Sequence, residues 1–371
     1  MILAPVERRD SERCPVTGTK GRVLSRRLGS NLAALYEDYF GEALPDEIVD
    51  RYFTEEIREY HSPESDLRWF SPAPIGGPEF YQYLAKTYPW YYTPETWDKH
   101  YARNLLRSAG VKRFLEVGCG EGCFLEMARQ VGLSGLGVET NEQARDRVRE
   151  RGLEAVLPAE LDAIDGDFDT LVMLQVLEHV PDPLGFVRYY VDRVRPARIV
   201  IAVPSHETLL SHVSDPLAWP PHHVTMWSRQ SFEHLGPALG YRLRRTAYSP
   251  MNYLRFVQLF DREIGIETPL GALRDRKGDA AMATDRVARW IRSIERHDTR
   301  MRDQERKDVV AKLIKSVYRR VLRPFSEPVE TTRVGPAWGR SKWLWHWCLG
   351  RPWARRDFWM LVVLERNPEG R

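Results

Sequence analysis

The fold is decided by one stretch of the chain, Phe114-Leu-Glu-Val-Gly-Cys-Gly-Glu-Gly-Cys-Phe-Leu-Glu-Met-Ala128. It begins with a short, mostly apolar run and continues into glycines at positions 118, 120 and 122. After the glycines, apolar residues recur at spacings of three and four. This order predicts a buried strand, a tight loop and a helix. Because glycine has no Cβ, such a loop can turn sharply and bring its backbone close to a ligand.

The loop has the pattern Glu116-x-Gly118-x-Gly120-x-Gly122. This differs from the Gly-x-Gly-x-x-Gly spacing of nicotinamide sites, which argues against a dehydrogenase. The pattern resembles the first motif of the class I S-adenosylmethionine-dependent methyltransferases, and the resemblance covers about residues 101–249. It implies a doubly wound, seven-stranded, mostly parallel α/β sheet. It also implies that Glu116 and the three glycines hold the amino acid end of S-adenosylmethionine. A structural turn without a ligand is the alternative.

Two further acids are candidates for the cofactor site. Residues 135–139 are typical of a second buried strand that ends in Glu139, and a carboxylate there can accept both hydrogen bonds of a ribose diol. The alternative for this acid is a solvated strand end. Thr140 follows it directly, at the start of a charged helix, and is also a cofactor candidate. A short third strand is expected at 154–158. By the resemblance, Glu160, which follows it, bonds the adenine amino group.

A fourth strand at 168–176 is apolar on both faces and leads into Leu177-Glu-His-Val-Pro-Asp-Pro183. This run resembles the Glu-His-Val-x-Asp-Pro signature of a subgroup that includes ubiquinone-type O-methyltransferases and sugar methyltransferases. Ligands of open parallel sheets lie at the carboxyl ends of the strands. Gln175 and Leu177 are therefore candidates for cofactor binding, and His179 is a candidate for catalysis.

Five of the ten histidines lie in residues 206–235. Pro220-Pro-His-His-Val-Thr-Met-Trp-Ser228 is similar to a Pro-x-His-His element of the same subgroup. A histidine there could accept a proton from a hydroxyl, because its pKa lies near working pH. His223 is the first candidate for this base and His222 the second. A structural histidine bonded to backbone is the alternative for one of the pair. No metal is expected, because the two histidines are adjacent and no acids lie near them in the sequence.

The composition is that of a soluble protein, and a formal net charge of +3 gives no reason to expect nucleic acid as a partner. Four scattered cysteines indicate a reducing compartment. Met1 to Asp10 lack the pattern of a secretory signal, and no apolar run of about 18 residues occurs. These observations predict a cytoplasmic protein.

Residues 1–100 are predicted to form an N-terminal segment. Cys14-Pro-Val-Thr-Gly18 resembles a zinc knuckle that has lost its second cysteine, since Thr17 stands in that place. The aromatic residues farther on are interpreted either as a lid over the site or as packing between this segment and the catalytic domain. The lid candidates are Tyr91, Tyr92 and Trp97.

The catalytic domain is assigned to 101–249, an insertion to 250–356 and the last strand of the sheet to 357–371. Apolar residues at helical spacing occur at 285–323, with arginine and lysine on the other face. Farther on, tryptophans stand among arginines, a combination that suits the membrane–water boundary. The hypothesis is that 285–356 contacts the inner face of an anionic membrane or shapes a pocket for a lipid-linked acceptor. A helical cap that packs on the catalytic domain is the alternative.

The resemblance implies methyl transfer from S-adenosylmethionine to a hydroxyl, or as the less favoured choice a carbon, of a sugar, glycan or lipid-linked small molecule. The alternative is a non-catalytic scaffold that keeps the cofactor fold at a membrane in glycan or lipid biosynthesis. The identity of the acceptor and the oligomeric state cannot be read from these motifs.

Overall fold

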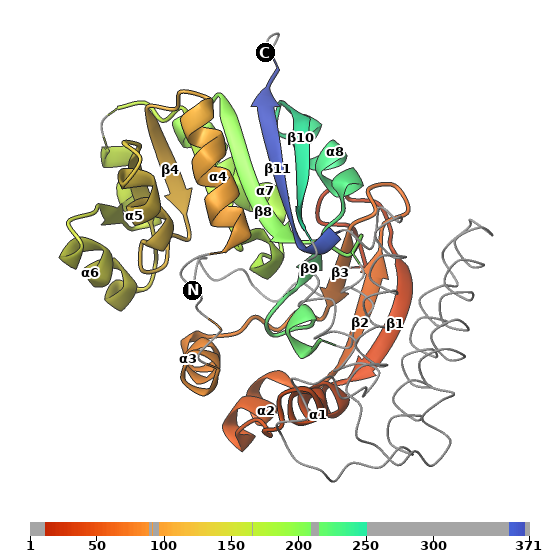
Figure 1. The fold of residues 1–371 in the computed structure, drawn as a ribbon. Helices are drawn as coiled ribbons and strands as arrows, with labels where there is room; N and C mark the ends of the chain where they lie inside the picture. Colours follow the sequence, from red (N-terminus) through yellow and green to blue (C-terminus); the bar gives the residue numbers. More distant parts are fainter. Residues whose placement is uncertain are drawn as a thin grey trace, which may run out of the picture. The chain divides into compact units, whose positions relative to one another are not determined.

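The centre of the fold is a seven-stranded sheet with the order β10-β11-β8-β7-β4-β5-β6 (Figure 1). The computed structural model describes residues 12–88, 91, 96–164, 166–208, 215–250 and 356–367. Strands β4 to β8 pair in parallel, whereas β11 runs antiparallel to β8. The strands are β4 (Arg113–Val117), β5 (Ser134–Val138), β6 (Ala155–Val156), β7 (Thr170–Leu174), β8 (Arg198–Pro204), β10 (Tyr241–Pro250) and β11 (Arg356–Arg366).

Helices cover both faces of this sheet. On one face the buried core contains residues of α4, α5 and α6, and on the other it contains residues of α7 and α8. The side chains of β4 alternate between the two cores, since Phe114 belongs to the first and Leu115 to the second. The predicted doubly wound α/β fold is therefore confirmed. The helices are α4 (Trp97–Ser108), α5 (Cys123–Arg129), α6 (Glu142–Glu150), α7 (Pro183–Val194) and α8 (Arg229–Ala238).

Two strands differ in extent from the sequence prediction. The strand expected at 154–158 is only the two-residue β6, because Pro158 already begins the 3₁₀-helix η1 (Pro158–Ala163). The last strand, expected at 357–371, is β11. The insertion expected at 250–356 lies, but for its first residue and its last, outside the described residues.

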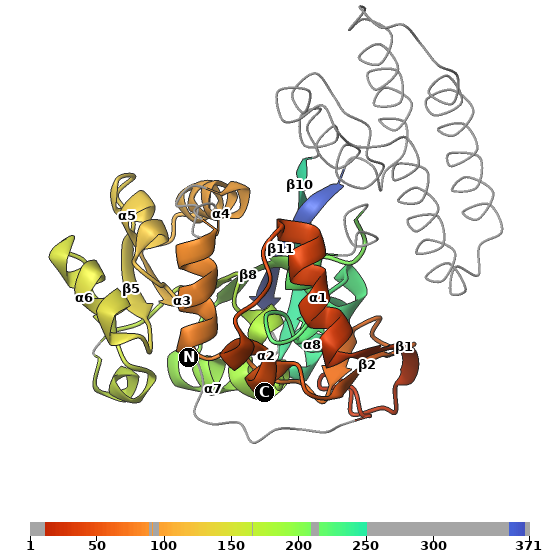
Figure 2. The same ribbon diagram turned by 90° about the horizontal axis from the view of Figure 1, so that it is seen from below.

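The N-terminal segment forms a second sheet with the order β1-β2-β3-β9. Three helices accompany it, and their apolar side chains share a core with its strands (Figure 2). The fourth strand of this sheet, β9, belongs to the later part of the chain and begins two residues after His223, before α8. The elements are β1 (Arg22–Leu28), β2 (Glu56–His61), β3 (Arg68–Ser71), β9 (Thr225–Met226), α1 (Gly29–Phe40), α2 (Asp46–Tyr52) and α3 (Pro78–Thr87).

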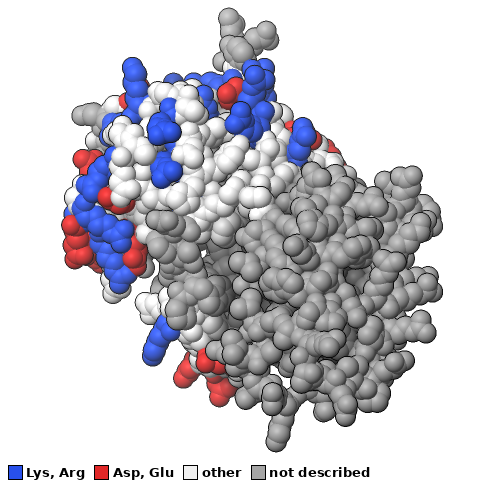
Figure 3. Space-filling view, viewed as in Figure 1, with Lys and Arg blue, Asp and Glu red and all other residues white. Residues whose placement is uncertain are grey.

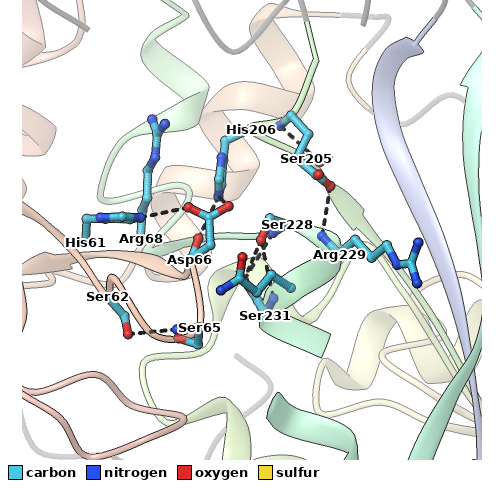
Figure 4. Close-up of polar contacts among 12 residues, drawn as sticks. His61, Ser62, Ser65, Asp66, Arg68, Ser205, His206, Ser228, Arg229 and Ser231 are labelled. Atoms are coloured by element: carbon cyan, nitrogen blue, oxygen red, sulfur yellow. Dashed lines mark hydrogen bonds and ion pairs between the residues drawn. The ribbon is translucent and has the colours of Figure 1, made fainter. Parts of the chain in front are cut away.

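A polar cluster joins the β2–β3 turn to the end of β8 and the start of α8 (Figure 4). Asp66 in that turn lies 2.7 Å from Nε2 of His61 through Oδ1, and its backbone oxygen lies 2.8 Å from Nε2 of His206. Burial raises the pKa of Asp66, but the hydrogen bond with His61 and the charge of His206 outweigh it and lower the pKa to about 2. Ser228 caps α8 beside this cluster. The N-terminal sheet is thus held to the larger sheet by polar contacts as well as by β9.

The knuckle-like turn near the N-terminus is present. The N–H of Gly18 donates to the carbonyl oxygen of Cys14 at 2.8 Å and closes the turn. The thiol of Cys14 is buried and lies 3.4 Å from the hydroxyl of Ser65. The thiol of this turn therefore packs inside the protein, against a residue of the N-terminal sheet's β2–β3 turn.

Cationic and acidic side chains alternate on the surface around α5 and α6 (Figure 3). Arg129 pairs with Glu126, and Arg149 pairs with Asp146, at distances of 2.6 and 2.9 Å. The positive charge of this surface is therefore partly balanced by ion pairs. Within the described residues, none of the helices has the length and apolar character needed to cross a bilayer.

Candidate active site

The glycine loop between β4 and α5 takes backbone conformations that favour glycine. Gly118, Gly120 and Gly122 have φ angles of 73°, 53° and 77°, in the left-handed region. A Cβ added to Gly120 would meet no atom of the described residues within 4 Å. The space beside Gly120 is thus free for a ligand to approach the backbone.

Glu139 at the end of β5 holds this loop in place. Its Oε2 accepts a hydrogen bond from the N–H of Gly120 at 3.0 Å, and its Oε1 accepts bonds from Thr140 and Asn141 at 2.8 Å each. The side chain is buried at the carboxyl edge of the sheet. The acid that the sequence assigns to the ribose therefore lies beside the glycine loop, and the role itself stays a prediction.

Within the part of the chain that the structure describes, two buried carboxyl groups near the loop lack hydrogen-bond partners for one oxygen each. They are Glu116 on β4, through Oε2, and Asp98 in the first turn of α4, through Oδ1. Burial raises the pKa of Glu116 to about 8. The other oxygen of Asp98 accepts a hydrogen bond from Nε2 of Gln175 at 3.3 Å. Buried acids without partners are costly unless a cation or donor binds them, so this pair fits a positively charged ligand.

Asp98 was not predicted from the sequence, because an acid in the first turn of a helix is usually a solvated N-terminal charge. Its burial depends on packing that the local pattern does not show. The one signal was its position among aromatic residues just before the first strand.

The remaining cofactor candidates lie in different surroundings. Gln175 has a φ of 57°, a strained conformation for a residue with a side chain, at the carboxyl end of β7. Leu177 is fully buried just after it. Glu160 is exposed, and its carboxylate accepts a hydrogen bond from the N–H of Leu157 at 2.7 Å at the start of η1. In the structure Glu160 caps the start of η1, and its contact with adenine stays a prediction.

The three candidate histidines come together. His179 ends the short 3₁₀-helix η2 (Leu177–His179) after β7, and His222 and His223 lie between η4 (Pro216–Ala218) and β9. The ring centroids are 4.9 Å apart for His179 and His222, 5.1 Å for His179 and His223, and 4.3 Å for His222 and His223.

Hydrogen bonds to carbonyl groups fix the tautomers of two of the rings. Nδ1 of His179 donates to the carbonyl oxygen of His222 at 2.6 Å, and Nδ1 of His222 donates to that of Leu217 at 2.9 Å. Nε2 of His222 consequently accepts a hydrogen bond from the hydroxyl of Tyr91 at 2.6 Å. No hydrogen bond to the ring of His223 occurs among the described residues. Of the adjacent pair, His222 is thus the one bonded to backbone.

Burial lowers the pKa of all three histidines. The pKa of His179 falls to about 4, and those of His222 and His223 fall well below the usual value. At neutral pH the rings are uncharged, and each has a nitrogen with a lone pair. Such nitrogens can accept a proton or bind a metal ion.

Of the lid candidates, one contacts the histidine cluster and another packs within α4. The hydroxyl of Tyr91 contacts His222, as described above, and Trp97 packs against Tyr101 at a centroid distance of 5.1 Å. Tyr92 lies outside the described residues. Phe80 and Tyr88 belong to the buried core of the N-terminal segment, so these aromatic residues serve packing.

A parallel sheet of this order, with an antiparallel strand at β11 and a glycine loop at the carboxyl end of its central strand, defines the methyltransferase version of the dinucleotide-binding fold. Residues 90–246 match the family described as a methyltransferase domain. This part of the chain is therefore similar to a class I methyltransferase domain.

The curated relatives that match are ubiquinone biosynthesis O-methyltransferases. The protein from Bordetella avium is 32% identical over 103 residues, which cover 25% of this chain and 43% of the relative. The protein from Parvibaculum lavamentivorans is 29% identical over 108 residues, which cover 27% of this chain and 43% of the relative. The chain thus matches less than half the length of these relatives.

Solved structures of methyltransferases are also similar. A SAM-dependent methyltransferase from Archaeoglobus fulgidus has 15% identity and a TM-score of 0.38, and the match covers 72% of this chain and 94% of that one. A magnesium protoporphyrin IX methyltransferase from Synechocystis with bound SAM has 14% identity and a TM-score of 0.32, over 42% of this chain and 72% of that one.

Proposed function

We propose that this chain transfers the methyl group of S-adenosylmethionine to a hydroxyl oxygen of a small molecule. The observation that carries the proposal is the pair of buried, partly unpartnered acids, Glu116 and Asp98, beside the glycine loop. S-adenosylmethionine carries two cationic groups, an ammonium and a sulfonium. Its positive charge would satisfy carboxylates that otherwise cost folding free energy.

In this proposal different residues around the loop bind different parts of the cofactor. Glu116 and the glycines hold its amino acid end, Glu139 and Thr140 its ribose, and Glu160 its adenine. Gln175 and Leu177 line the carboxyl end of β7 beside it. The bound cofactor supplies an electrophilic methyl group, so the protein contributes mainly proximity and alignment for an in-line displacement.

His223 is the proposed acceptor of the hydroxyl proton. Its ring is buried and uncharged, and no hydrogen bond in the described residues occupies it. His222 and His179 are held by backbone carbonyl groups, and their ring centroids lie 4.3 and 5.1 Å from that of His223. A base of this kind matters for a hydroxyl that is a poor nucleophile.

The acceptor class we propose is a sugar, glycan or lipid-linked small molecule. The relatives' names specify O-methylation, which supports oxygen over carbon. A scaffold that binds no cofactor would gain nothing from buried acids beside a glycine loop. The scaffold alternative is therefore not favoured. We further propose that the protein acts in the cytoplasm, with residues 285–356 in peripheral contact with the membrane.

The test uses S-adenosylmethionine with a labelled methyl group, the purified chain and an extract of its source. Products are partitioned between organic and aqueous phases. Label in the organic phase supports a lipid-linked acceptor, and label in the aqueous phase supports a soluble sugar or glycan. A chain that does not bind S-adenosylmethionine in a calorimetric titration would overturn the proposal.

A further inference from the structure

We propose that His179, His222 and His223 form a binding site for a divalent transition-metal ion, for which Zn²⁺ is the suitable probe. Among the described residues, these three offer ring nitrogens that all lie within 4.8 Å of one another. Imidazole nitrogen is a preferred ligand of zinc, copper, iron and nickel. Three histidines with one open position are a known type of catalytic zinc site.

The hydrogen bonds of the cluster orient the rings as metal ligands are oriented. A metal-binding histidine usually donates its other ring N–H to a carboxylate, a carbonyl group or water. His179 and His222 both donate Nδ1–H to backbone carbonyl oxygens, at 2.6 and 2.9 Å. Their Nε2 atoms are therefore the lone-pair nitrogens, and each would be the ligand atom of its ring.

Only small movements separate this arrangement from a coordinated one. Zinc–nitrogen bonds of about 2.0–2.1 Å place tetrahedral ligand atoms about 3.3 Å apart. One ring nitrogen of each residue lies within 4.8 Å of the other two, so ring rotations that move such nitrogens by about 1 Å suffice. Since no hydrogen bond from a described residue holds the ring of His223, that ring can rotate, and the metal would replace the hydroxyl of Tyr91 at Nε2 of His222.

An independent observation also points to a cation here. Glu178 is 1% exposed, and within the described residues neither of its carboxyl oxygens has a hydrogen-bond partner. Its Oε1 lies 3.9 Å from Nε2 of His179, the proposed ligand atom. A metal ion on the histidines would place a positive charge next to this buried acid and compensate it. The prediction of no metal relied on the lack of nearby acids along the sequence, and Glu178 comes near His222 and His223 only through the fold.

The metal site lies at the histidines that the proposed function assigns to catalysis. The role of the metal in methyl transfer therefore rests on the proposed function, whereas binding of the metal does not. A zinc ion on three imidazoles keeps a position for water or an acceptor oxygen. A hydroxyl bound there would lose its proton to water more readily, because the cation would stabilise the alkoxide. With metal bound, His223 would be a ligand, and the metal would supply the activation of the acceptor in its place. The acceptor class would then be molecules whose hydroxyl can coordinate a metal.

The test is a calorimetric titration of the untagged, EDTA-treated full chain with Zn²⁺, with bound zinc measured after desalting. We expect one Zn²⁺ per chain. His179→Ala and His223→Ala should each weaken Zn²⁺ binding at least tenfold, and Glu178→Gln should weaken it while keeping the shape of the side chain. His234→Ala is the matched control, because this histidine lies on α8 outside the cluster. Circular dichroism checks that each variant folds.

Co²⁺ gives a second measurement that needs no variant, because nitrogen-ligated Co²⁺ has a characteristic visible spectrum. Absence of stoichiometric Zn²⁺ binding, or equal binding by the His179→Ala/His223→Ala double variant, would overturn the inference. Titration with S-adenosylmethionine in EDTA separates the two proposals. Cofactor binding without zinc binding overturns only the metal site, and zinc binding without cofactor binding overturns only the methyltransferase proposal.

Discussion

At the scale of single residues, the site is dominated by acids that the fold buries without complete hydrogen bonding. Glu116 and Glu178 each have a pKa raised to about 8, chiefly by burial. In the protein without ligand these groups hold protons at neutral pH. A bound cation favours the ionised carboxyl group, so binding and proton release are linked.

This linkage predicts that the affinity for S-adenosylmethionine rises with pH. Between about pH 6 and 7.5, Glu116 must lose a proton when the cation binds, so the Kd should fall by up to about tenfold per pH unit. Calorimetry at several pH values measures this slope. Glu116→Gln should flatten it, and because the cofactor's own amino group titrates equally in both proteins, the difference between them reports Glu116. Parallel slopes would show that Glu116 does not contact the cation.

A second prediction separates binding from catalysis. Glu139→Ala should weaken cofactor binding about ten- to a hundredfold, since it removes charge-assisted hydrogen bonds worth about 1.5–3 kcal/mol. His223→Ala should leave cofactor affinity intact and lower turnover by about a hundredfold or more. Titration and initial rates measure the two effects, with exposed Glu150→Ala as the control. The division of roles fails if both variants lose cofactor affinity equally.

The sequence identified the residues whose local pattern is distinctive and missed those whose environment comes from packing. Glu139 could be found because it ends a strand at a fixed distance from the glycine loop. Asp98 and Glu178 could not be recognised as buried, because short-range sequence does not show which acids the fold shields from water. The convergence of His179 with His222 likewise needs the sheet, since 43 residues separate them.

At the scale of elements, the N-terminal sheet and the histidine loop are connected. β9 pairs with β3 and directly follows the segment that carries His222 and His223. The hydroxyl of Tyr91, also from the N-terminal segment, binds His222. A two-residue strand such as β9 has no period that sequence reasoning could detect, so this connection could not be predicted although the larger sheet could.

The polar cluster between these elements should make stability depend on pH. Burial, followed by the charge of Arg68, lowers the pKa of His206 to about 4. In the unfolded chain His206 therefore binds a proton near pH 6.5, whereas in the folded chain it stays uncharged until about pH 4. Stability is lost as pH falls from about 6.5 towards 4. Each such histidine contributes up to about 1.4 kcal/mol per pH unit in this window.

The corresponding variant is His206→Asn, measured by urea unfolding at several pH values. The buried histidines of the active site titrate in the same window, so the unfolding free energy of the variant should still depend on pH. Its slope against pH should be smaller than that of the unchanged protein by up to one proton. Asp66 contributes separately, because its lowered pKa of about 2 keeps its stabilisation intact above about pH 4 and loses it only below. An unchanged slope in His206→Asn would show that this histidine is not buried uncharged.

At the scale of the whole molecule, the N-terminal segment and the methyltransferase domain belong to one compact unit. The two parts are therefore expected to unfold together rather than as separate domains. The hypothesis of a lipid-linked acceptor depends on the tryptophan- and arginine-rich sequence of 285–356. Whether the acceptor is lipid-linked is thus a question for the full chain.

The membrane hypothesis predicts that the full chain co-sediments with anionic vesicles at low salt and is released as salt screens the attraction. A basic residue near such a surface contributes about 1 kcal/mol, so replacing Arg340, Lys342 and Arg351 by alanine should weaken binding about a hundredfold. Replacing the same number of arginines on and after α6, Arg147, Arg149 and Arg151, is the matched control and should have little effect. Equal binding to neutral vesicles would indicate apolar insertion by the tryptophans. Failure to bind anionic vesicles would leave the helical cap as the interpretation of this sequence and favour a soluble acceptor.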